Sequence, residues 1–426
     1  MDVVSAYLNG KIDRDVYMRQ PEGFDDLTGR VCKLNKSIYG LKQSGRIWNN
    51  TINDYLLSIG FKRCPAEPCV YTSNMITLLL YVDDVIIFAN DSNALKNLKS
   101  RLASKFKITD LGELHHVLGI AVTKSGNKYL LNQTHYIEQI LNKFHSASKF
   151  KSTPAIHKLL LESTKEVNDE LVDQQRYQTI LGSIMYLVSC TRPDIAFTTS
   201  MLSQFAAKPN VQHQMALDRL LEYLNFTKRK SLIITPSNEI NISAYSDADW
   251  ASDINDRKSF SGFVIKVNDS IVNWSSRKQN VVATSTSEAE YIALTSTAKD
   301  LLWWISFMNS INVIIKFKPV IYCDNISAMT IAEGKGKFSK SKHFDIKLNF
   351  IKDIIERSIL KVEFIPSKLQ LADILTKALP RTAHETLTKR LNLHDTHNGG
   401  ECQMLYESCT YMSMYNVVLA AYDHTH

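Results

Sequence analysis

The stretch ITLLLYVDDVIIFAN, residues 76–90, places two adjacent acids, Asp83 and Asp84, inside a strongly apolar run. Two apolar arms around a short acidic segment predict a β-hairpin with the acids at its tip. A solvated turn is the simple alternative, because tight turns favour Asp. However, the turn lacks glycine and both arms look buried on both faces. Ionised carboxylates in such a setting repel each other and lose hydration, so a divalent cation such as Mg²⁺ is the expected compensation.

Length and composition set the broad class of the chain. With 426 residues, 44% hydrophobic and 22% charged, it exceeds one typical core and predicts a globular protein of two or three domains. A net charge of +7 is compatible with a nucleic-acid partner without implying one. The seven cysteines are scattered and form no CxxC pair, so neither a disulfide framework nor a zinc site is predicted. No run approaches the ~20 apolar residues of a membrane span.

The sequence around the hairpin alternates between helical and strand patterns. Residues 44–59 and 92–106 are predicted to be helices, the second from apolar side chains at a spacing of three to four. Residues 151–175 are polar and predict a linker or a surface excursion. A helical region follows at about 176–228, interrupted by prolines.

The pattern changes at about residue 241. Three strands and then alternating helices and strands predict a compact α/β domain with a mixed sheet. The last helix is expected at about 369–379. Residues 381–426 show little periodicity and are expected to form a loose tail.

Four acids of this second half occur at the ends of predicted elements. Asp247 lies on the first strand, Glu290 at the start of the long helix, Asp324 at a strand end and Asp373 in the last helix. Each has a local alternative: Ser287-x-x-Glu290 fits a capping box, Asp324 fits an N-cap, and Asp373 fits a solvated position. Their order along the chain nevertheless allows distant carboxylates to converge on one metal site.

Taken together, the motifs resemble the reverse transcriptase–ribonuclease H portion of a copia-type LTR-retrotransposon Pol polyprotein. The resemblance covers about residues 1–393 and rests on several independent motifs in the family order. They are MDVVSAYLNGKIDRDVYMRQPEGF, KLNKSIYGLKQSGRIWN, LLLYVDDVIIFA, LGIAV…LNQTHYIEQIL, TRPDIAF, AYSDADWASD, TSTSEAEYIAL, CDNISAM, KSKHFDI and LADILTK.

The resemblance implies a multidomain chain of α/β and α+β class. Residues 1–150 are expected to form a reverse-transcriptase palm with partial fingers and thumb, lacking the N-terminal fingers. Residues 151–240 would be a connection region, residues 241–380 a ribonuclease H-like α/β domain, and residues 381–426 the C-terminal tail.

The resemblance also implies roles for residues of the polymerase half. Asp2, which by itself reads as part of a disordered terminus, matches the first polymerase carboxylate, and Asp83 with Asp84 matches the YVDD pair. In the family these acids hold two Mg²⁺ ions, which Mn²⁺ can replace. Tyr7 matches the aromatic residue that disfavours ribose 2′-hydroxyls. Gln43 lies near the position that contacts the template and the incoming nucleotide.

In the second half, the resemblance implies a ribonuclease H site with two further Mg²⁺ ions. The family carboxylates match Asp247, Glu290, Asp324 and Asp373. Glu288 competes with Glu290 for its role; Glu290 is favoured because E-Y-I-A fits the family pattern. The basic segment 334–347, with Lys342, is expected to contact the phosphates of the hybrid, and His343 to assist product release. The alternative for the segment is a solvated basic loop, and the alternative for His343 is a surface histidine without such a role.

The implied partners are an RNA template, a DNA primer, an RNA–DNA hybrid and deoxynucleoside triphosphates, with no membrane and no specified oligomeric state. The expected location is the cytoplasm, inside a virus-like particle in an intact element, or the nucleus. Family members carry a segment before the motif of Asp2, so we expect a fragment that starts at an internal methionine. Smaller departures are QSGR where Q-A-P-R is usual and Asn349 where histidine is common.

Three hypotheses follow from the sequence. The first is an RNA-directed DNA polymerase fused to a ribonuclease H. The second is a remnant with an inactive polymerase and an active ribonuclease H, motivated by the missing fingers segment. The third is a non-enzymatic remnant that binds nucleic acid weakly through its positive charge.

Overall fold

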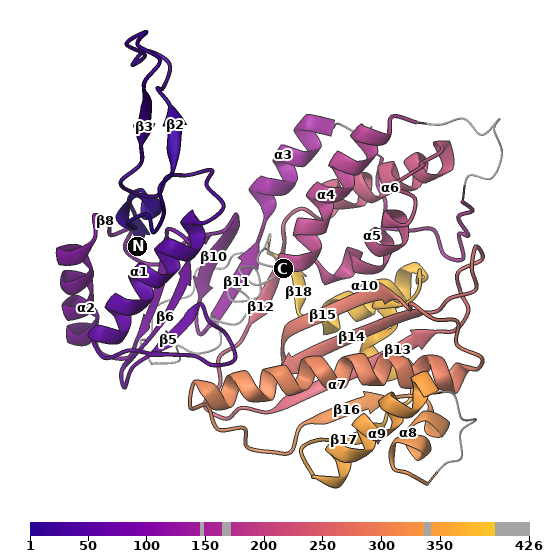
Figure 1. The fold of residues 1–426 in the computed structure, drawn as a ribbon. Helices are drawn as coiled ribbons and strands as arrows, with labels where there is room; N and C mark the ends of the chain where they lie inside the picture. The colour runs from indigo at the N-terminus through magenta and orange to yellow at the C-terminus, as the bar shows by residue number, and fades with distance from the viewer. Residues whose placement is uncertain (145–148, 164–171, 336–341, 397–426) are drawn as a thin grey trace. The chain divides into compact units, whose positions relative to one another are not determined.

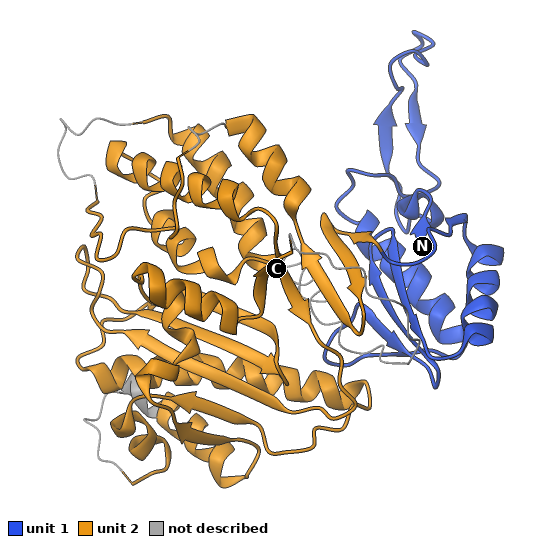
Figure 2. Cartoon of the chain, turned by 180° about the vertical axis from the view of Figure 1, so that it is seen from behind, with its two compact units in different colours: residues 1–114 blue, residues 115–426 orange. Residues whose placement is uncertain are grey.

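The computed structural model describes residues 1–144, 149–163, 172–335 and 342–396. The chain divides into two compact units, residues 1–114 and 115–426 (Figure 2). The domain boundaries predicted at residues 150, 240 and 380 stay predictions. Among the described residues, no helix combines the length and the apolar character needed to cross a membrane.

Unit 1 is built on a six-stranded antiparallel sheet with the order β4-β5-β6-β7-β1-β8 (Figure 1). Its strands are β1 (Asp2–Val3), β4 (Lys62–Arg63), β5 (Val70–Thr72), β6 (Ile76–Tyr81), β7 (Asp84–Ala89) and β8 (Ile108–Thr109). A separate ribbon pairs β2 (Tyr17–Arg19) with β3 (Val31–Lys33). The 3-10 helix η1 (Ala6–Asn9) follows β1.

Two helices pack against this sheet, as the sequence predicts. Helix α1 (Ser44–Ser58) buries Trp48, Ile52 and Leu56, which recur every four residues and therefore share one face. Helix α2 (Ser92–Lys105) is capped by Asp91, whose side chain accepts hydrogen bonds from N–H groups of the first turn of the helix. Both helices bury their apolar faces in one core with strands β6 and β7, so the predicted hairpin packs against α1 and α2.

Unit 2 contains a five-stranded antiparallel sheet and a group of helices. The sheet has the order β18-β12-β11-β10-β9, and its strands are β9 (His116–Val117), β10 (Ile120–Ser125), β11 (Lys128–Asn132), β12 (Lys230–Ile234) and β18 (Leu393–Asp395). The helices are α3 (Thr134–Phe144), α4 (Gln174–Cys190), η2 (Pro193–Ile195), α5 (Ala196–Ser203) and α6 (Val211–Thr227). Leu161 is buried in the core of these helices, so this part of the predicted linker is packed; residues 164–171 lie outside the described residues.

The mixed sheet predicted after residue 241 forms the rest of unit 2 and matches the expected α/β class. Its order is β15-β14-β13-β16-β17, from β13 (Ile242–Asp249), β14 (Phe260–Val267), β15 (Ser270–Lys278), β16 (Val320–Cys323) and β17 (Lys361–Phe364). The first three strands are antiparallel, whereas β13, β16 and β17 are parallel. Helix α7 (Thr286–Ser310) packs along β13, β14 and β16, and α8 (Ile326–Ala332) and α9 (Lys342–Glu356) pack beside it (Figure 1).

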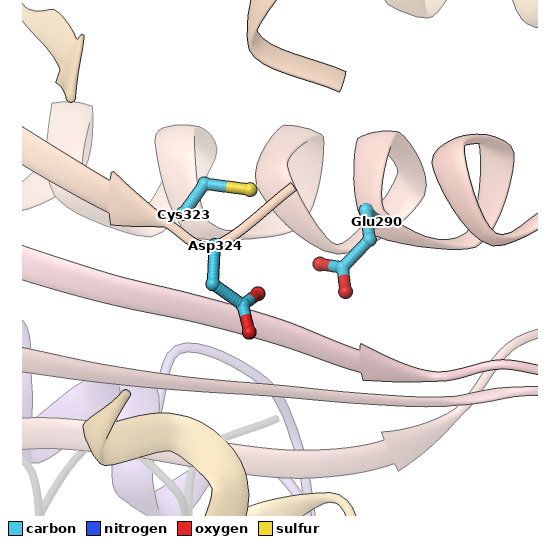
Figure 3. A group of neighbouring side chains, drawn as sticks. All are labelled: Glu290, Cys323 and Asp324. Atoms are coloured by element: carbon cyan, nitrogen blue, oxygen red, sulfur yellow. The ribbon is translucent and has the colours of Figure 1, made fainter. Parts of the chain in front are cut away.

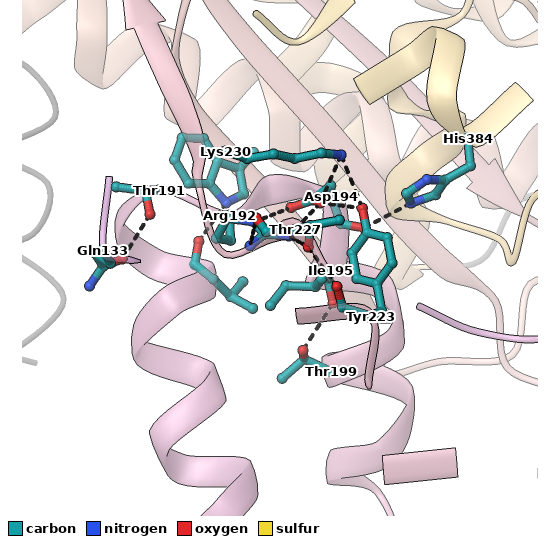
Figure 4. A network of polar contacts seen from close by, with 12 residues as sticks. Gln133, Thr191, Arg192, Asp194, Ile195, Thr199, Tyr223, Thr227, Lys230 and His384 are labelled. Carbon is teal, nitrogen blue, oxygen red and sulfur yellow. Dashed lines mark hydrogen bonds and ion pairs between the residues drawn. The ribbon is translucent and has the colours of Figure 1, made fainter. Parts of the chain in front are cut away.

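A buried polar network ties the TRPDIAF segment to helix α10 (Arg381–Arg390) (Figure 4). Arg192 and Asp194 form a fully buried ion pair through two hydrogen bonds of 2.9 Å. Burial raises the pKa of Asp194, but Arg192, Lys230 and Tyr223 together more than offset this and hold it below its ordinary value. Tyr223 donates to the same carboxylate at 2.6 Å, and the His384 ring contacts the Asp194 carbonyl oxygen at 3.2 Å. Because a buried charge needs a partner, this network fixes how the helices meet the C-terminal elements.

Two expectations for the C-terminal part were wrong. Residues 381–395 are not a loose tail: they form helix α10 (Arg381–Arg390), anchored by His384, and strand β18, which pairs with β12. The α-helix predicted at about 369–379 is replaced by two short 3-10 helices, η3 (Ser367–Leu369) and η4 (Leu371–Leu375). Four of the five residues of η4 are buried against the sheet, a demand that one face of an α-helix cannot meet.

Candidate active sites

The first cluster of acids lies where β1 pairs with β7 in unit 1. Asp2 is the direct cross-strand partner of Asp84. The adjacent residues Met1 and Val85 exchange both backbone hydrogen bonds, at 2.9 Å each. Asp2 and Asp84 therefore form a non-hydrogen-bonded pair, the position where opposed side chains lie closest together. The structure thus brings together two carboxylates that lie 82 positions apart in the sequence.

The third acid of this cluster, Asp83, lies in the two-residue turn between β6 and β7. Its neighbour Val82 adopts a φ of 51°, an unusual conformation for a β-branched residue. The indole N–H of Trp48 donates to the Val82 carbonyl at 2.8 Å and so holds the strained turn from α1. The hairpin tip is therefore fixed by the core behind it, which keeps Asp83 beside Asp84.

Electrostatics at the tip favour a cation. Burial raises the pKa of Asp84; Asp2 raises it further, the terminal ammonium lowers it, and Asp83 adds to the rise. Like charges opposed across a strand pair destabilise a sheet. The Oδ1 atom of Asp83 is buried and has no hydrogen-bond partner among the described residues. An uncompensated carboxylate oxygen beside two other carboxylates fits the oxygen-only coordination that Mg²⁺ prefers.

Two tyrosines lie beside this cluster. Tyr39 donates a hydrogen bond from its hydroxyl to Asp83 Oδ2 at 2.8 Å. Partial burial raises the pKa of Tyr39 to about 12, and the bond to Asp83 acts in the same direction, so the hydroxyl stays protonated as a donor. The ring of Tyr7, on η1, lies 4.5 Å from the ring of Tyr39. Tyr39 was missed from the sequence, although it belongs to the motif KLNKSIYGLKQSGR.

Gln43 lies at the start of helix α1. It is half-buried and occupies the N-cap position, where its side chain makes no capping hydrogen bond. Its backbone carbonyl accepts a hydrogen bond from the Ile47 N–H at 3.0 Å. The structure therefore places Gln43 at the edge of the helix that supports the hairpin, and its predicted role in binding nucleotides stays a prediction.

The second cluster of acids lies at one end of the mixed sheet in unit 2. Tyr245 of β13 pairs in parallel with Tyr322 of β16, so Asp247 and Asp324, two residues further along, reach the same end of the sheet. Glu290, in the second turn of α7, has a carboxylate oxygen within 4.8 Å of one from Asp324 (Figure 3). Asp373, on η4, interacts electrostatically with both strand acids.

Burial and mutual repulsion dominate the electrostatics of this cluster. Burial raises the pKa of Glu290 to about 9, with Asp247 and then Asp324 acting in the same direction. Burial and Asp247 likewise raise the pKa of Asp373 to about 7. Oε2 of Glu290 is buried and has no hydrogen-bond partner in the described part of the chain. These acids therefore fit hard divalent cations, which would replace the missing hydrogen bonds and screen the charges.

The geometry separates Glu290 from its competitor Glu288. Glu288 accepts hydrogen bonds from the N–H and the hydroxyl of Thr284, at 2.7 and 2.6 Å, and its own N–H donates to the Ser285 hydroxyl oxygen, which caps the helix. Glu288 therefore completes the start of α7, whereas Glu290 lies with the other acids. The capping contact that competed for Glu290 in the sequence belongs to Glu288.

Two further residues contact the acid cluster and were missed from the sequence. The ammonium of Lys377 lies 2.8 Å from Asp373 Oδ1 and 3.6 Å from Asp247 Oδ2. The hydroxyl of Thr376 donates to Asp247 Oδ2. Both belong to the motif LADILTK, in which only the aspartate was singled out. They position the carboxylates of Asp247 and Asp373 and offset part of the negative charge.

The close approach of η4 to strand β14 predicts the effect of one substitution. Gly262 is the cross-strand partner of Asp247, and a Cβ at this position would lie 2.8 Å from Leu375 Cβ and Thr376 Cγ2. Gly262→Ala is expected to displace η4, lower stability by about 1–3 kcal/mol and move Asp373 and Thr376 away from Asp247. Thermal unfolding measures the first effect, and Mg²⁺ titration followed by heat release measures the second.

The matched control for this substitution is Gly182→Ala. Gly182 lies inside helix α4, and apart from the backbone of its own helix and its two chain neighbours nothing lies within 4 Å of the added Cβ. Because alanine favours helix, this variant is expected to gain up to about 1 kcal/mol. Equal unfolding temperatures for the two variants would show that β14 and η4 do not need the glycine.

The raised pKa of Glu290 predicts a pH-dependent stability in the presence of a chelator. A carboxyl whose folded pKa lies above its ordinary value of 4.5 costs no stability below pH 4.5 and costs progressively more as the pH rises towards 9. Glu290→Gln, which cannot ionise, is therefore expected to be more stable than the unchanged chain at pH 8, by about 1–3 kcal/mol. The difference should vanish near pH 4.5. Thermal unfolding in EDTA from pH 4.5 to 9 measures it, and parallel curves would contradict it.

Part of the predicted basic segment falls outside the described residues. Residues 336–341 are not described, and Lys342 and His343 begin helix α9 with side chains that are not described either. Further along the helix, Lys347 is described, and burial lowers its pKa, with Lys299 nearby adding to the effect. The roles of Lys342 and His343 therefore stay predictions.

The two clusters offer ligands that suit divalent cations. Comparisons with known proteins identify the family to which the chain belongs. The family described as reverse transcriptase (RNA-dependent DNA polymerase) matches residues 1–157. The retrovirus-related Pol polyprotein from transposon TNT 1-94 of Nicotiana tabacum is 35% identical over 411 residues, which cover 92% of this chain and 31% of that protein. A putative transposon Ty5-1 protein of Saccharomyces cerevisiae is 30% identical over 311 residues, covering 71% of this chain and 100% of that protein.

The chain therefore belongs to the reverse transcriptase family of copia-type retrotransposon Pol polyproteins. This confirms the resemblance inferred from the motifs. The chain spans about a third of the length of the first Pol polyprotein it matches, 31%. Among solved structures, a foamy viral protease–reverse transcriptase in complex with RNA/DNA hybrid has a TM-score of 0.46 at 14% identity, covering 95% of this chain and 49% of that one.

Proposed function

We propose that the chain is an RNA-directed DNA polymerase joined to a ribonuclease H, and that each activity uses two divalent cations. One observation carries the proposal: each compact unit gathers its own cluster of carboxylates from segments far apart in the sequence. In each cluster a buried carboxylate oxygen lacks a hydrogen-bond partner among the described residues, on Asp83 and on Glu290. Two metal sites of this kind support two phosphoryl-transfer activities.

In unit 1, Asp2, Asp83 and Asp84 would hold two Mg²⁺ ions, or Mn²⁺. These cations would activate the primer 3′-hydroxyl and stabilise the charge on the attacked α-phosphate. Tyr39 orients the Asp83 carboxylate through its hydrogen bond and packs against Tyr7. Tyr7 would meet the sugar of the incoming deoxynucleoside triphosphate and disfavour a 2′-hydroxyl there, and Gln43 would contact the template and the nucleotide.

In unit 2, the cations would be held by Asp247, Glu290, Asp324 and Asp373. They would position a water molecule to cleave the RNA strand of an RNA–DNA hybrid and leave a 5′-phosphate. Thr376 and Lys377, the two residues that follow η4, contact Asp247 and Asp373 and hold these carboxylates in place. The hybrid would cross this end of the sheet, with Lys342 on its phosphates and His343 assisting product release.

The test is a pair of assays on the purified full chain at neutral pH. One follows extension of a DNA primer on an RNA template, and the other follows cleavage of the RNA strand in an RNA–DNA hybrid. Both activities are expected with Mg²⁺ or Mn²⁺ and absent in EDTA. Cleavage without extension would leave a ribonuclease H alone, and the loss of both would leave a protein that only binds nucleic acid.

A further inference from the structure

A cysteine lies at the edge of the second cluster and has no role in the proposed function. Cys323 is the last residue of β16 and is fully buried. Its Sγ atom and carboxylate oxygens of Glu290 and Asp324 all lie within 4.8 Å of one another. Figure 3 shows the three side chains near one another: Glu290 comes from helix α7, whereas Cys323 and Asp324 come from the end of strand β16.

These three donors differ in kind from the oxygen ligands that Mg²⁺ prefers. Thiolate sulfur selects softer cations, and Zn²⁺ readily combines one sulfur with carboxylate oxygens. With bonds of about 2.3 Å to sulfur and 2.0–2.2 Å to oxygen, two ligands of a tetrahedral zinc ion lie roughly 3.5 Å apart. The donors lie no more than 4.8 Å apart, so they need to approach one another by at most about 1.3 Å, a shift within the reach of side-chain rotation.

A second observation points to a ligand at the same place. Glu290 is only 7% exposed, and its Oε2 atom has no hydrogen-bond partner among the described residues. A buried carboxylate oxygen of this kind carries a desolvation cost until something binds it. The donor set of Glu290, Cys323 and Asp324 thus combines a soft ligand with an uncompensated hard one.

We propose that Glu290, Cys323 and Asp324 form a site for a thiophilic divalent cation, and that Zn²⁺ is the cation that it binds in the cell. A cation bound there withdraws Glu290 and Asp324 from Mg²⁺ and so inhibits cleavage of the hybrid. The inhibitory consequence rests on the proposed ribonuclease H function, whereas binding of the cation does not. On binding, the thiol proton passes to the solvent as the metal–sulfur bond forms.

Direct binding is measured with Cd²⁺, which reports its bond to a thiolate by charge-transfer absorption. The full chain, freed of metals, is titrated beside Cys323→Ala, and Cys64→Ala serves as the matched control because Cys64 is a buried thiol of unit 1. The unchanged chain and Cys64→Ala are expected to bind one more Cd²⁺ ion, with its absorption band, than Cys323→Ala. Equal stoichiometry and equal bands in all three proteins would overturn the site.

Inhibition is measured separately, by titrating Zn²⁺ into the hybrid-cleavage assay at fixed Mg²⁺. Cys323→Ala is expected to need at least about tenfold more Zn²⁺ for half inhibition, equivalent to about 1.4 kcal/mol of zinc affinity. Cys323→Ser repeats the test with a side chain close in size to the thiol. Equal inhibition in all variants, with the Cd²⁺ difference retained, would keep the site and overturn its regulatory effect. If the chain shows no cleavage at all, the Cd²⁺ titration still decides whether the site exists.

Discussion

Glu290→Gln is expected to reduce Mg²⁺-dependent cleavage of the RNA strand in a hybrid by about 10³-fold or more, a loss of about 4 kcal/mol of transition-state stabilisation. The carboxylate oxygen that would bind the metal is replaced in part by an amide N–H₂, which repels a cation. The substitution keeps the size of the side chain and replaces a group whose burial makes it costly to ionise. The variant should therefore remain folded while its activity is lost. Single-turnover cleavage at saturating hybrid measures the effect on the chemical step.

The matched control is Glu288→Gln, the same chemical change two residues earlier on helix α7. Glu288 accepts hydrogen bonds from Thr284 at the helix start and lies outside the acid cluster. Its substitution is expected to leave cleavage within about threefold and to cost about 1 kcal/mol of stability. Similar losses in both variants, or a greater loss in Glu288→Gln, would contradict the assignment of Glu290.

Asp84→Asn is expected to reduce primer extension on an RNA template by a similar factor, about 10³-fold or more, while hybrid cleavage stays unchanged. Asp84 faces Asp2 at a non-hydrogen-bonded pair, so the amide removes one of the two opposed charges that a cation would join. Because the repulsion across the strands also falls, metal-free unit 1 should not be destabilised. Loss of extension together with an unchanged unfolding temperature separates a chemical role from a structural one.

The control for unit 1 is Asp54→Asn, on the exposed side of helix α1. It makes the same change in charge away from the hairpin tip and is expected to leave extension within about twofold. If Asp84→Asn lost hybrid cleavage as well as extension, the two clusters could not be independent sites. If it retained extension, the hairpin tip would not hold the polymerase metals.

Much of the fold could be predicted from local patterns. The hairpin at 76–90 was readable because its two arms are continuous apolar runs, and helix α1 because Trp48, Ile52 and Leu56 repeat on one face. Patterns of this kind depend on residues a few positions apart, where helix and strand geometry is fixed. The 3-10 segment η4 was misread as a helix because its buried residues are set by the surface of β14, which local spacing does not report.

The same distinction between local pattern and tertiary structure applies to the candidate sites. The sequence by itself determined the order of the acids, the motifs and, through them, the family. Only the tertiary structure decided that Asp2 faces Asp84, that Glu290 rather than Glu288 joins the second cluster, and that Tyr39, Lys377 and Cys323 lie beside the acids. The reason is physical: distances between residues tens of positions apart follow from strand order, register and the packing of helices on the sheet, and these depend on the whole chain.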